Sequence, residues 1–217
     1  MKPKQLVIVG TGGLAKEAAQ LARVIDPSGS RWATISYVAE DAQSLGVELP
    51  FGSVRYTDQQ LVARSQSGDV VIGIGNPTVR RNVARRLKDN RALRFPNLIH
   101  PSVELDEDWV AIGRGNMITK GVIMTVNIRV GDFNVINWNA TIGHDTEIGS
   151  YNVVNPGANI GGCVQVLDEC LLGAGCQVLE RKRICSNATI GAGAVVIGHI
   201  AEPGTYIGVP ARRIPNK

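Results

Sequence analysis

The sequence of 217 residues contains no apolar run that approaches the roughly eighteen residues a membrane-crossing helix needs. Although 44% of the residues are hydrophobic, we therefore do not expect a membrane-spanning protein. The chain begins Met1-Lys2-Pro3-Lys4 and continues with only a five-residue apolar strand, so a secretory signal peptide is not expected either. These absences predict a soluble protein of the cytoplasm.

Unbalanced charge and paired cysteine motifs are also missing. The net charge of +4 is modest, which disfavours nucleic-acid binding, because that function usually requires a concentrated basic stripe. Anionic small ligands suit this charge better. The four cysteines lack the CxxC spacing of zinc sites and redox motifs, so we interpret them as reduced packing residues. They are Cys163, Cys170, Cys176 and Cys185.

The strongest feature that is present is a six-residue repeat in the second half of the chain. An aliphatic residue recurs at every sixth position, and such fixed-period self-similarity is the signature of a solenoid. A period of six fits a short strand plus a turn, with one residue of each unit pointing into a common core. We predict a parallel β-helix. The repeated residues are Ile112, Ile118, Met124, Val130, Ile136, Ile142, Ile148, Val154, Ile160, Val166, Leu172, Val178, Ile184, Ile190 and Val196.

The size of one coil follows from the repeat. Three hexads per coil predict an eighteen-residue triangular coil, in which residue i stacks on residue i+18 at about 4.8 Å. Glycine often follows the inward aliphatic residue, and small side chains recur four positions after it, as tight corners require. The pattern does not determine the handedness of the coil. The hexads stop at Glu202, before Pro203-Gly204, which predicts the end of the solenoid.

The first hundred residues predict a parallel α/β domain. A strand over residues 5–9 is followed by a glycine-rich turn and an amphipathic helix over 14–25. Further strands alternate with a helix, as in parallel sheets. Because the residue before proline avoids helix, His100-Pro101 marks the predicted boundary between domains at 1–100 and 101–217. The other predicted elements are strands at 32–38, 69–74 and 93–98 and a helix at 77–87.

The glycine turn is the first candidate for a ligand site. The segment Gly10-Thr11-Gly12-Gly13-Leu14-Ala15 is close to the pattern G-x-G-x-x-A, and it lies after a strand and at a helix start. Free backbone N–H groups and the helix dipole favour phosphate there. Glu40 and Asp41 stand just past the second strand, where an acidic residue can hold a ribose or a base. The alternative is a turn built for packing alone.

Histidine is the second candidate. The chain has three, and His144 follows a glycine in the middle of the repeat, where side chains point toward the coil surface. The adjacent Asp145 can hold an imidazole in one tautomer, so that it acts as a general base near neutral pH. From spacing alone, an inert surface histidine is equally acceptable. We interpret His100, beside the boundary proline, and His199, in the terminal turn, as structural.

Taken together, these motifs resemble the sialic acid O-acetyltransferase family of sugar acyltransferases, which includes bacterial N-acetyltransferases of nucleotide-linked 4-amino sugars. The resemblance covers nearly the whole chain. It implies a small Rossmann-like N-terminal domain that holds the nucleotide, a left-handed β-helix, a homotrimer, acetyl-CoA bound between neighbouring β-helices, and no metal. The motifs are Gly10–Lys16, Ile99-His100-Pro101-Ser102, Ile136-Asn137, Ile142-Gly143-His144-Asp145, Pro156-Gly157-Ala158 and Gly208-Val209-Pro210-Ala211-Arg212.

The resemblance also implies roles for single residues. His144 matches the family's general base, Asp145 the acid that orients it, and Asn137 an asparagine that contacts the sugar. Gly162 lies one predicted coil after His144, where its backbone N–H would oppose the developing oxyanion. On the acceptor side the predicted residues are Gly12, Gly13, Leu14, Glu40 and Asp41. On the donor side they are Gly162, Asn155, Gly191, Pro210 and Arg212.

Two positions depart from the family. Leu14 stands where members that act on nucleotide amino sugars often have histidine, and Val153 stands where many members have a second histidine near the donor. The first departure removes the contact that such a histidine would make with the nucleotide. The second requires donor binding through backbone groups or through a neighbour such as Asn155.

We predict an acetyl-CoA-dependent N-acetyltransferase that acts directly on the amino group of a nucleotide-linked amino sugar in bacterial surface-glycan biosynthesis. O-acetylation of a sugar of the sialic acid type is the alternative. A nicotinamide-dependent enzyme is disfavoured, because fewer than a hundred residues precede the solenoid and the β-helix would have no task. A non-catalytic scaffold that only assembles trimers would tolerate the loss of His144.

Overall fold

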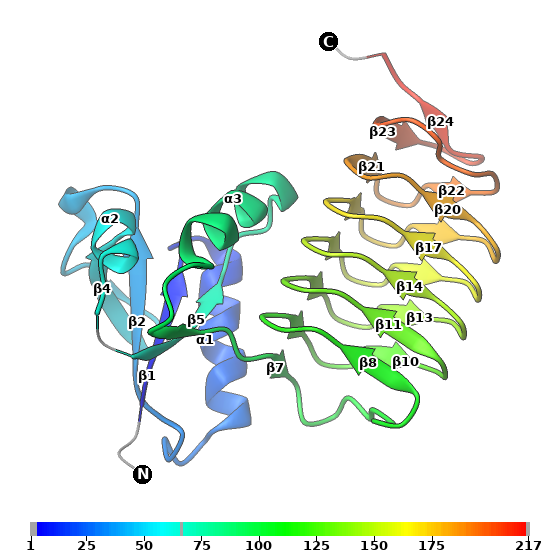
Figure 1. The fold of residues 1–217 in the computed structure, drawn as a ribbon. Coiled ribbons are helices and arrows are strands. Elements are labelled where there is room, and N and C mark those ends of the chain that lie inside the picture. The colour runs from blue at the N-terminus through cyan, green and yellow to red at the C-terminus, as the bar shows by residue number, and fades with distance from the viewer. Residues whose placement is uncertain (1–3, 66, 216–217) are drawn as a thin grey trace.

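The computed structural model describes residues 4–65 and 67–215 and shows two domains (Figure 1). An α/β domain precedes a long stack of short parallel strands. Within the described ranges, no helix is long and apolar enough to cross a membrane.

The α/β domain is built on a six-stranded sheet, sheet A, in the order β3-β4-β2-β1-β5-β6. All of its pairs are parallel except β3 with β4. Helix α1 covers one face of the sheet, and α2 and α3 cover the other. The strands are β1 (Lys4–Val9), β2 (Trp32–Ala39), β3 (Glu48–Leu49), β4 (Gly52–Thr57), β5 (Gly68–Ile72) and β6 (Leu93–Arg94), and the helices are α1 (Gly13–Ile25), the 3-10 turn η1 (Ala42–Ser44), α2 (Asp58–Val62) and α3 (Pro77–Leu87).

Most predicted elements of this domain are present, with two corrections. The strand predicted over 93–98 is two strands, because β6 pairs with β5 whereas β7 (Leu98–Ile99) pairs with β9 (Met117–Ile118) of the β-helix. Strand β5 ends at Ile72 rather than at Ile74, and the chain then turns at Gly73. A Cβ on Gly73 would lie 2.6 Å from the Cα of Ala15, so only glycine allows this turn to approach α1 so closely.

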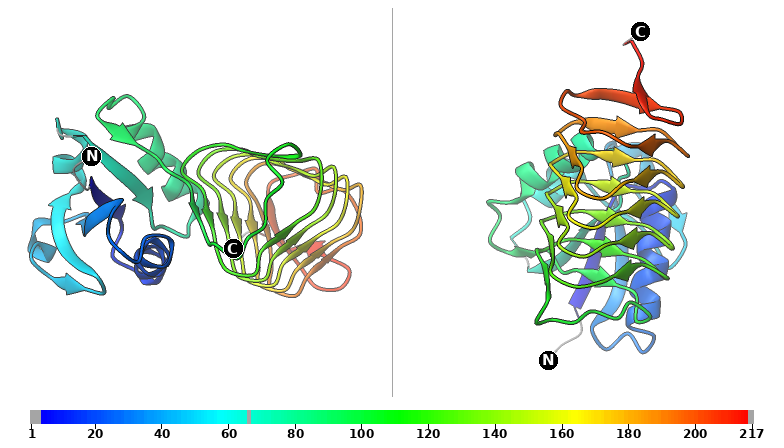
Figure 2. Two further views of the ribbon diagram at one scale, coloured as in Figure 1. Left: turned by 90° about the horizontal axis from the view of Figure 1, so that it is seen from below. Right: turned by 90° about the vertical axis from the view of Figure 1, so that its right-hand side faces the viewer.

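The second domain is a parallel β-helix with three sheets, and Figure 2 shows its coils end-on. The strands of sheet B are β7, β9 (Met117–Ile118), β12 (Val135–Ile136), β15 (Val153–Val154), β18 (Leu171–Leu172), β21 (Ala188–Ile190), β23 (Gly204–Ile207) and β24 (Arg212–Arg213). Sheet C has β8 (Val110–Ile112), β11 (Ile128–Val130), β14 (Glu147–Ile148), β17 (Gln165–Val166) and β20 (Arg183–Ile184). Sheet D has β10 (Ile123–Met124), β13 (Thr141–Ile142), β16 (Asn159–Ile160), β19 (Gln177–Val178) and β22 (Val195–Val196).

The strand register confirms the predicted coil of eighteen residues. Thr141 pairs with Asn159, Glu147 with Gln165 and Val153 with Leu171. The aliphatic residues of the hexads are buried in one continuous core, apart from Ile112, which is partly exposed. Beyond Glu202 the chain does not leave the solenoid at once: β23 still adds to sheet B, and β24 closes it as an antiparallel hairpin.

The two domains pack through sheet B of the β-helix. Its outward-pointing Met117, Val135 and Val153 are buried with α1 and sheet A in one hydrophobic cluster. At the edge of this interface, Arg81 of α3 forms an ion pair with Glu169 at 2.7 Å. Sheets C and D, and the corner that joins them, therefore lie on the far side of the β-helix from the α/β domain.

Candidate active site

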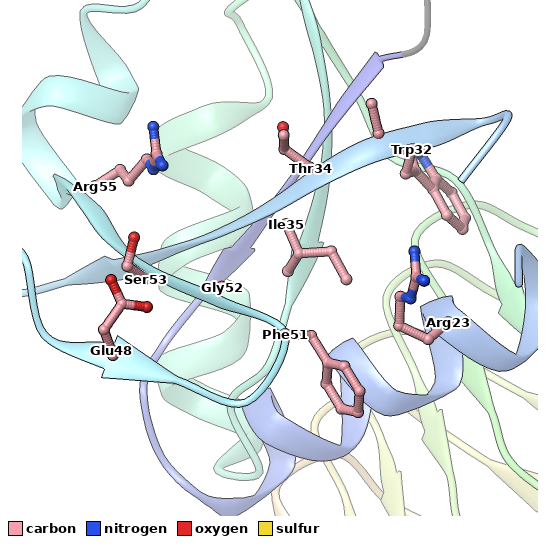
Figure 3. A pocket seen from close by; sticks show the side chains of 10 residues that line it. Arg23, Trp32, Thr34, Ile35, Glu48, Phe51, Gly52, Ser53 and Arg55 are labelled. Carbon is pink, nitrogen blue, oxygen red and sulfur yellow. The ribbon is translucent and has the colours of Figure 1, made fainter. Parts of the chain in front are cut away.

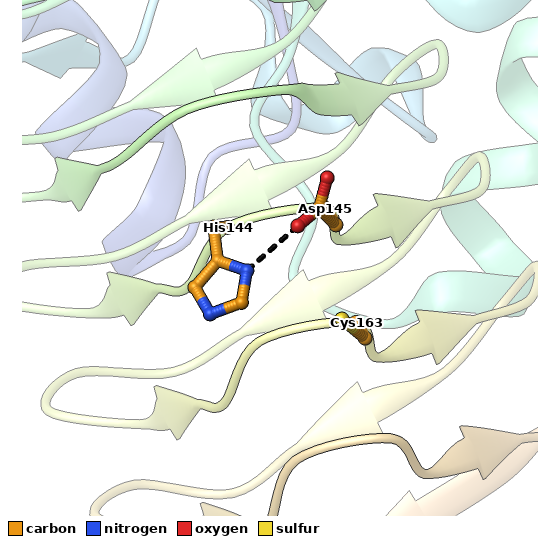
Figure 4. Close-up of side chains that lie close together, drawn as sticks. All are labelled: His144, Asp145 and Cys163. Atoms are coloured by element: carbon orange, nitrogen blue, oxygen red, sulfur yellow. Dashed lines mark hydrogen bonds and ion pairs between the residues drawn. The ribbon is translucent and has the colours of Figure 1, made fainter.

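His144 and Asp145 lie at the corner between β13 of sheet D and β14 of sheet C. His144 Nδ1 is 2.7 Å from Asp145 Oδ2, and the two side chains are 55% and 48% exposed (Figure 4). Asp145 adopts a left-handed backbone conformation with φ of 57°, which aspartate tolerates better than most residues. With Nδ1 engaged by the carboxylate, Nε2 is the nitrogen left to accept a proton from a substrate. The predicted pairing of these two residues is present.

The carboxylate of Asp145 has a second partner that the sequence analysis did not identify. Asn127, one coil earlier at the same corner, donates from Nδ2 to Asp145 Oδ1 at 2.6 Å. The hydrogen bonds from His144 and then from Asn127 lower the pKa of Asp145 below its ordinary value, and only slight desolvation opposes them. Asp145 is therefore ionised at neutral pH and able to stabilise an imidazolium.

Gly162 lies in the next coil directly against the imidazole of His144. A Cβ built on Gly162 would be only 2.6 Å from His144 Nε2 and 2.7 Å from Cε1. Among the described residues the Gly162 N–H has no hydrogen-bond partner, whereas the next N–H, of Cys163, donates to the His144 carbonyl at 2.7 Å. The predicted stacking of Gly162 on His144 is thus observed, and one free backbone donor lies beside the imidazole.

A metal ion is the competing interpretation of this corner. In the described ranges, one group of three histidine, cysteine or acidic residues has its potential ligand atoms within 4.8 Å of one another: His144, Asp145 and Cys163. Tetrahedral nitrogen and oxygen ligands of Zn²⁺, at about 2.0–2.1 Å from the ion, lie roughly 3.3 Å apart. The 2.7 Å between His144 Nδ1 and Asp145 Oδ2 is instead a hydrogen-bond distance. The geometry favours a base with its orienting carboxylate.

A pocket of about 460 Å³ opens at the carboxyl edge of sheet A, around the glycine turn. Helix α1 begins there with no side-chain cap on its first turn, so its backbone N–H groups remain available to an anion. A Cβ on Gly12 or Gly13 would meet nothing within 4 Å, so both glycines face open space. All predicted acceptor-side residues except Asn137 line this pocket: Gly12, Gly13, Leu14, Glu40 and Asp41.

The opposite wall of this pocket carries charged groups that the sequence analysis missed. Arg86 of α3 pairs with Asp58 at 2.7 Å, and both line the pocket. Asp41 is already engaged, since its Oδ1 accepts hydrogen bonds from the backbone N–H and the hydroxyl of Ser44. No hydrogen bond or ion pair links Glu40 to another described residue, so its carboxylate is available to a ligand.

A smaller groove of about 290 Å³ continues from the glycine turn onto the β-helix. Leu14 lines both this groove and the larger pocket, and so joins them. On the β-helix side the groove is lined by Asn137, Trp138 and Asn155, at the corner between sheets B and D. Asn137 therefore lies where an acceptor would extend. The structure also places Asn155, predicted for the donor, in this acceptor groove.

The structure does not bring the glycine turn and His144 of one chain together. The α/β domain packs on sheet B, and the corner that carries His144 joins the other two sheets. Neither His144 nor Asp145 lines any part of the pocket or groove described above. The candidate base and the candidate acceptor pocket of one chain lie on opposite sides of its β-helix.

The remaining donor-side candidates lie near the C-terminal end of the stack. Gly191 lies beneath β23, where a Cβ would be 2.7 Å from Ile207 Cγ2. Pro210 is partly exposed. Arg212 is exposed, and within the described ranges its side chain donates a hydrogen bond only to the neighbouring Ala211 carbonyl. Arg213 is paired with Glu202 at 2.7 Å. None of these residues contacts His144.

The sequence analysis missed a positively charged segment that lies closer to His144. The position one coil beyond Gly162 lies at the corner that carries His144, and it is followed directly by Arg181, Lys182 and Arg183. The side chains of Arg181 and Arg183 are exposed, and no ion pair with another described residue neutralises them. A step of eighteen residues from Gly162 toward the C-terminus, the length of one coil, would have led to this segment.

A further hollow of about 400 Å³ lies elsewhere on the α/β domain (Figure 3). Its walls come from the C-terminal part of α1 and the first residues of β2 and β4, including Arg23, Trp32 and Gly52. These elements are at the opposite edge of sheet A from the glycine turn. The hollow is therefore separate from the candidate site.

Residues 5–87 match the family model described as the PglD N-terminal domain. A variant of perosamine N-acetyltransferase from Caulobacter crescentus, solved with CoA and GDP-perosamine, is 26% identical, with 98% of this chain and 97% of that chain covered and a TM-score of 0.85. The acetyltransferase domain of PglB from Neisseria gonorrhoeae, solved with acetyl coenzyme A, is 26% identical, with 98% and 100% covered and a TM-score of 0.87. The expected resemblance to the sugar acetyltransferases is confirmed.

The same comparisons confirm the predicted fold class, an α/β domain followed by a left-handed parallel β-helix, and the assignment as an acetyltransferase enzyme. WeeI from Acinetobacter baumannii shares this fold at 24% identity, with 97% of this chain and 99% of that chain covered and a TM-score of 0.84. No curated protein sequence matches the chain.

Proposed function

We propose that this protein is an acetyl-CoA-dependent N-acetyltransferase that acts on the amino group, at C4 in our expectation, of a nucleotide-linked amino sugar. The observation that carries the proposal is the His144–Asp145 pair stacked on Gly162, on a β-helix whose attached domain presents an open helix N-terminus. One similar solved structure contains CoA and GDP-perosamine, and another contains acetyl coenzyme A. O-acetylation of a sugar remains the alternative.

The proposed reaction is a direct transfer. The acceptor amine attacks the thioester carbonyl of acetyl-CoA, and His144 Nε2 takes the proton that the amine loses. Asp145 stabilises the resulting imidazolium, and the free N–H of Gly162 faces the oxyanion as it develops. When the tetrahedral intermediate collapses, the C–S bond breaks and the thiolate of CoA receives the proton that His144 took up. None of these steps requires a metal ion.

We further propose that the donor extends along the corner that carries His144. One coil raises the chain by about 4.8 Å, so the segment Arg181–Arg183 lies about two coils above the base. Its exposed guanidinium groups suit the phosphates of CoA. Arg212 lies farther along the stack, whereas Arg213 is already paired with Glu202.

We propose a homotrimer in which His144 of one subunit meets the acceptor groove of a neighbour. Within one chain these two parts lie on opposite sides of the β-helix, so a second copy is needed to complete the site. Sheet D supplies the contact face: Ile123 is 58% exposed and Leu179 and Ile197, just past its strands, are nearly half exposed. Apart from Ala111, the outward residues of the sheet C strands are polar and exposed: Arg129, Glu147, Gln165 and Arg183.

The function is tested by following thiol release from acetyl-CoA with purified protein and a panel of nucleotide-linked amino sugars and free sialic acids. We expect turnover with a nucleotide amino sugar, lowered roughly 10²- to 10⁴-fold by His144→Ala. His100→Ala is the matched control, because among the described residues the His100 side chain hydrogen-bonds only to Ser102, within its own turn. Turnover with free sialic acid alone would favour the O-acetyltransferase, and full activity of His144→Ala would reject this residue as the base.

The shared site is tested by complementation. His144→Ala keeps an intact acceptor pocket, whereas Gly13→Val keeps an intact base. Co-expressed subunits that carry one change each should recover activity in mixed trimers, because one interface then combines two unaltered halves. Light scattering should give the mass of three chains. Mixed assemblies without recovered activity would show that each subunit uses its own base.

The proposed location is the cytoplasm, where acetyl-CoA and nucleotide sugars are made, and the proposed role is in the synthesis of bacterial surface glycans.

A further inference from the structure

The side chain of Asn127 completes a line of three groups at the catalytic corner. It lies eighteen residues before Asp145, at the same corner one coil earlier. Its Nδ2 donates to Asp145 Oδ1 at 2.6 Å, while Asp145 Oδ2 lies 2.7 Å from His144 Nδ1. The two oxygens of one carboxylate are therefore held from two different coils.

This arrangement limits the freedom of the carboxylate. A carboxylate bonded through one oxygen can still rotate about its Cβ–Cγ bond, which would carry Oδ2 away from the imidazole. A second hydrogen bond on Oδ1 fixes the plane of the group and so the direction in which Oδ2 faces His144. Asp145 is 48% exposed and gains little from packing, so Asn127 supplies most of this restraint.

We propose that Asn127 is a positioning residue for the base, the third member of a His144–Asp145–Asn127 relay. The inference rests on the proposed function, in which His144 takes a proton from the acceptor. Asn127 does not touch the substrate in this arrangement. It acts through Asp145, by holding the carboxylate in the orientation that keeps the imidazole aligned and Nε2 directed outward.

The identity of the residue follows from the geometry. Asn127 has a φ of 56°, a left-handed conformation that asparagine tolerates. Its amide presents an N–H to Asp145, whereas an aspartate would present a second carboxylate and repel it. The titratable groups that face Asp145 are the imidazole of His144 and the thiol of Cys163 in the next coil. Neither can replace the donor lost from Asn127.

Two substitutions test the proposal in the full chain. Asn127→Gly removes the amide and keeps the left-handed backbone free of strain; kcat should fall about tenfold, the contribution of one hydrogen bond to a charged group, while both KM values stay within about twofold. Asn127→Asp places two carboxylates in contact, so one pKa of the pair rises strongly. The acid limb of its pH profile for kcat/KM should then move to higher pH.

Asn187→Gly is the matched control. Asn187 is also exposed, has a φ of 62°, and lies at a corner remote from His144. Its replacement should leave kcat and the pH profile unchanged. A double-mutant cycle completes the test: in an Asp145→Asn background, Asn127→Gly should cause little further loss, since the group through which it acts has changed.

The outcomes separate this inference from the function on which it rests. If His144→Ala lowers kcat but both Asn127 variants keep the parental kcat and pH profile, the relay is wrong and the function stands. An equal loss from Asn127→Gly in the parental and the Asp145→Asn backgrounds would also overturn the relay. If His144→Ala has no effect on turnover, the proposed base itself fails.

Discussion

The imidazole of His144 lies so close to the Cα of Gly162 that a Cβ at that position would be 2.6 Å from Nε2. Gly162→Ala should therefore push the ring out of line, and a misplacement of this size costs roughly 100-fold in kcat. Gly198→Ala is the matched control, because Gly198 lies two coils further at the same corner and a Cβ there meets nothing within 4 Å. Steady-state kinetics of the two folded variants check the prediction. Equal kcat values for both would contradict it.

The acceptor pocket is tested at Gly13. A Cβ there points into open space, so Gly13→Val should fold normally but intrude on a bound nucleotide. KM for the nucleotide sugar should rise strongly, while KM for acetyl-CoA stays nearly unchanged. Gly73→Val gives the contrast, because its side chain would clash with the backbone of Ala15 and should lower stability instead. If the folded Gly13→Val variant shows an equal rise in KM for both substrates, the turn is not the acceptor pocket. An acceptor without a nucleotide then becomes the better hypothesis.

Arg80 of α3 joins the two domains through backbone carbonyls. Its fully buried guanidinium donates to the carbonyls of Phe133 in the β-helix and of Ile72 and Ile74 beside the pocket. Burial lowers the pKa of Arg80 to about 9, so the group remains charged at neutral pH. Arg80→Met should destabilise the protein by about 3 kcal/mol, because the three carbonyls lose a charged donor. Chemical denaturation measures this. Arg85→Met, on the exposed side of α3, should change stability little, and equal values for both variants would contradict the prediction.

Asp26 makes stability depend on pH. Its carboxylate accepts hydrogen bonds from the backbone N–H groups of Trp32 and Arg31 and from the hydroxyl groups of Ser30 and Ser28. These bonds, chiefly that of Trp32, lower its pKa against the opposing effect of desolvation. A depressed folded-state pKa stabilises the fold above the ordinary value of about 3.9, and this stability is lost as the pH falls below it. Asp26→Asn should lower the free energy of unfolding by about 2 kcal/mol at pH 7, and this gap between the variant and the parental protein should disappear in acid. Asp89→Asn, at an exposed site, serves as the control. A gap that is the same at acid and neutral pH would rule out the ionised carboxylate as its source.

The buried cysteines should resist alkylation in the folded protein. Burial raises the pKa of Cys170 to about 12 and that of Cys176 to about 11, so almost no thiolate forms at pH 8. Iodoacetamide should label the partly exposed Cys163 first, as mass spectrometry of timed samples can show. After unfolding, all four should react alike. If Cys170 reacted as fast as Cys163 in the native protein, it would not be a buried packing residue.

The six-residue period was sufficient to predict the β-helix, its eighteen-residue coil and the contact between His144 and Gly162. In a β-helix, residues eighteen apart are neighbours, so long-range contacts can be counted along the chain. A step of eighteen residues also places Asn127 one coil before Asp145, and Arg181 one coil after Cys163. The sequence analysis missed both residues, because it took only a single step of eighteen residues, from His144 toward the C-terminus. In the α/β domain, β3, β4 and α2 were missed, because short, polar segments such as Gly52–Thr57 carry little hydrophobic periodicity.

The sequence by itself determined two domains, an open glycine turn and a histidine beside a carboxylate, since each depends on local spacing or on a fixed repeat. Only the tertiary structure decided how these parts face one another. Sheet B carries Met117, Val135 and Val153 outward, and their burial against α1 places the acceptor pocket on the side of the β-helix away from His144. No periodicity encodes that choice, because it depends on which of three similar faces offers apolar surface that fits a domain folded from distant residues.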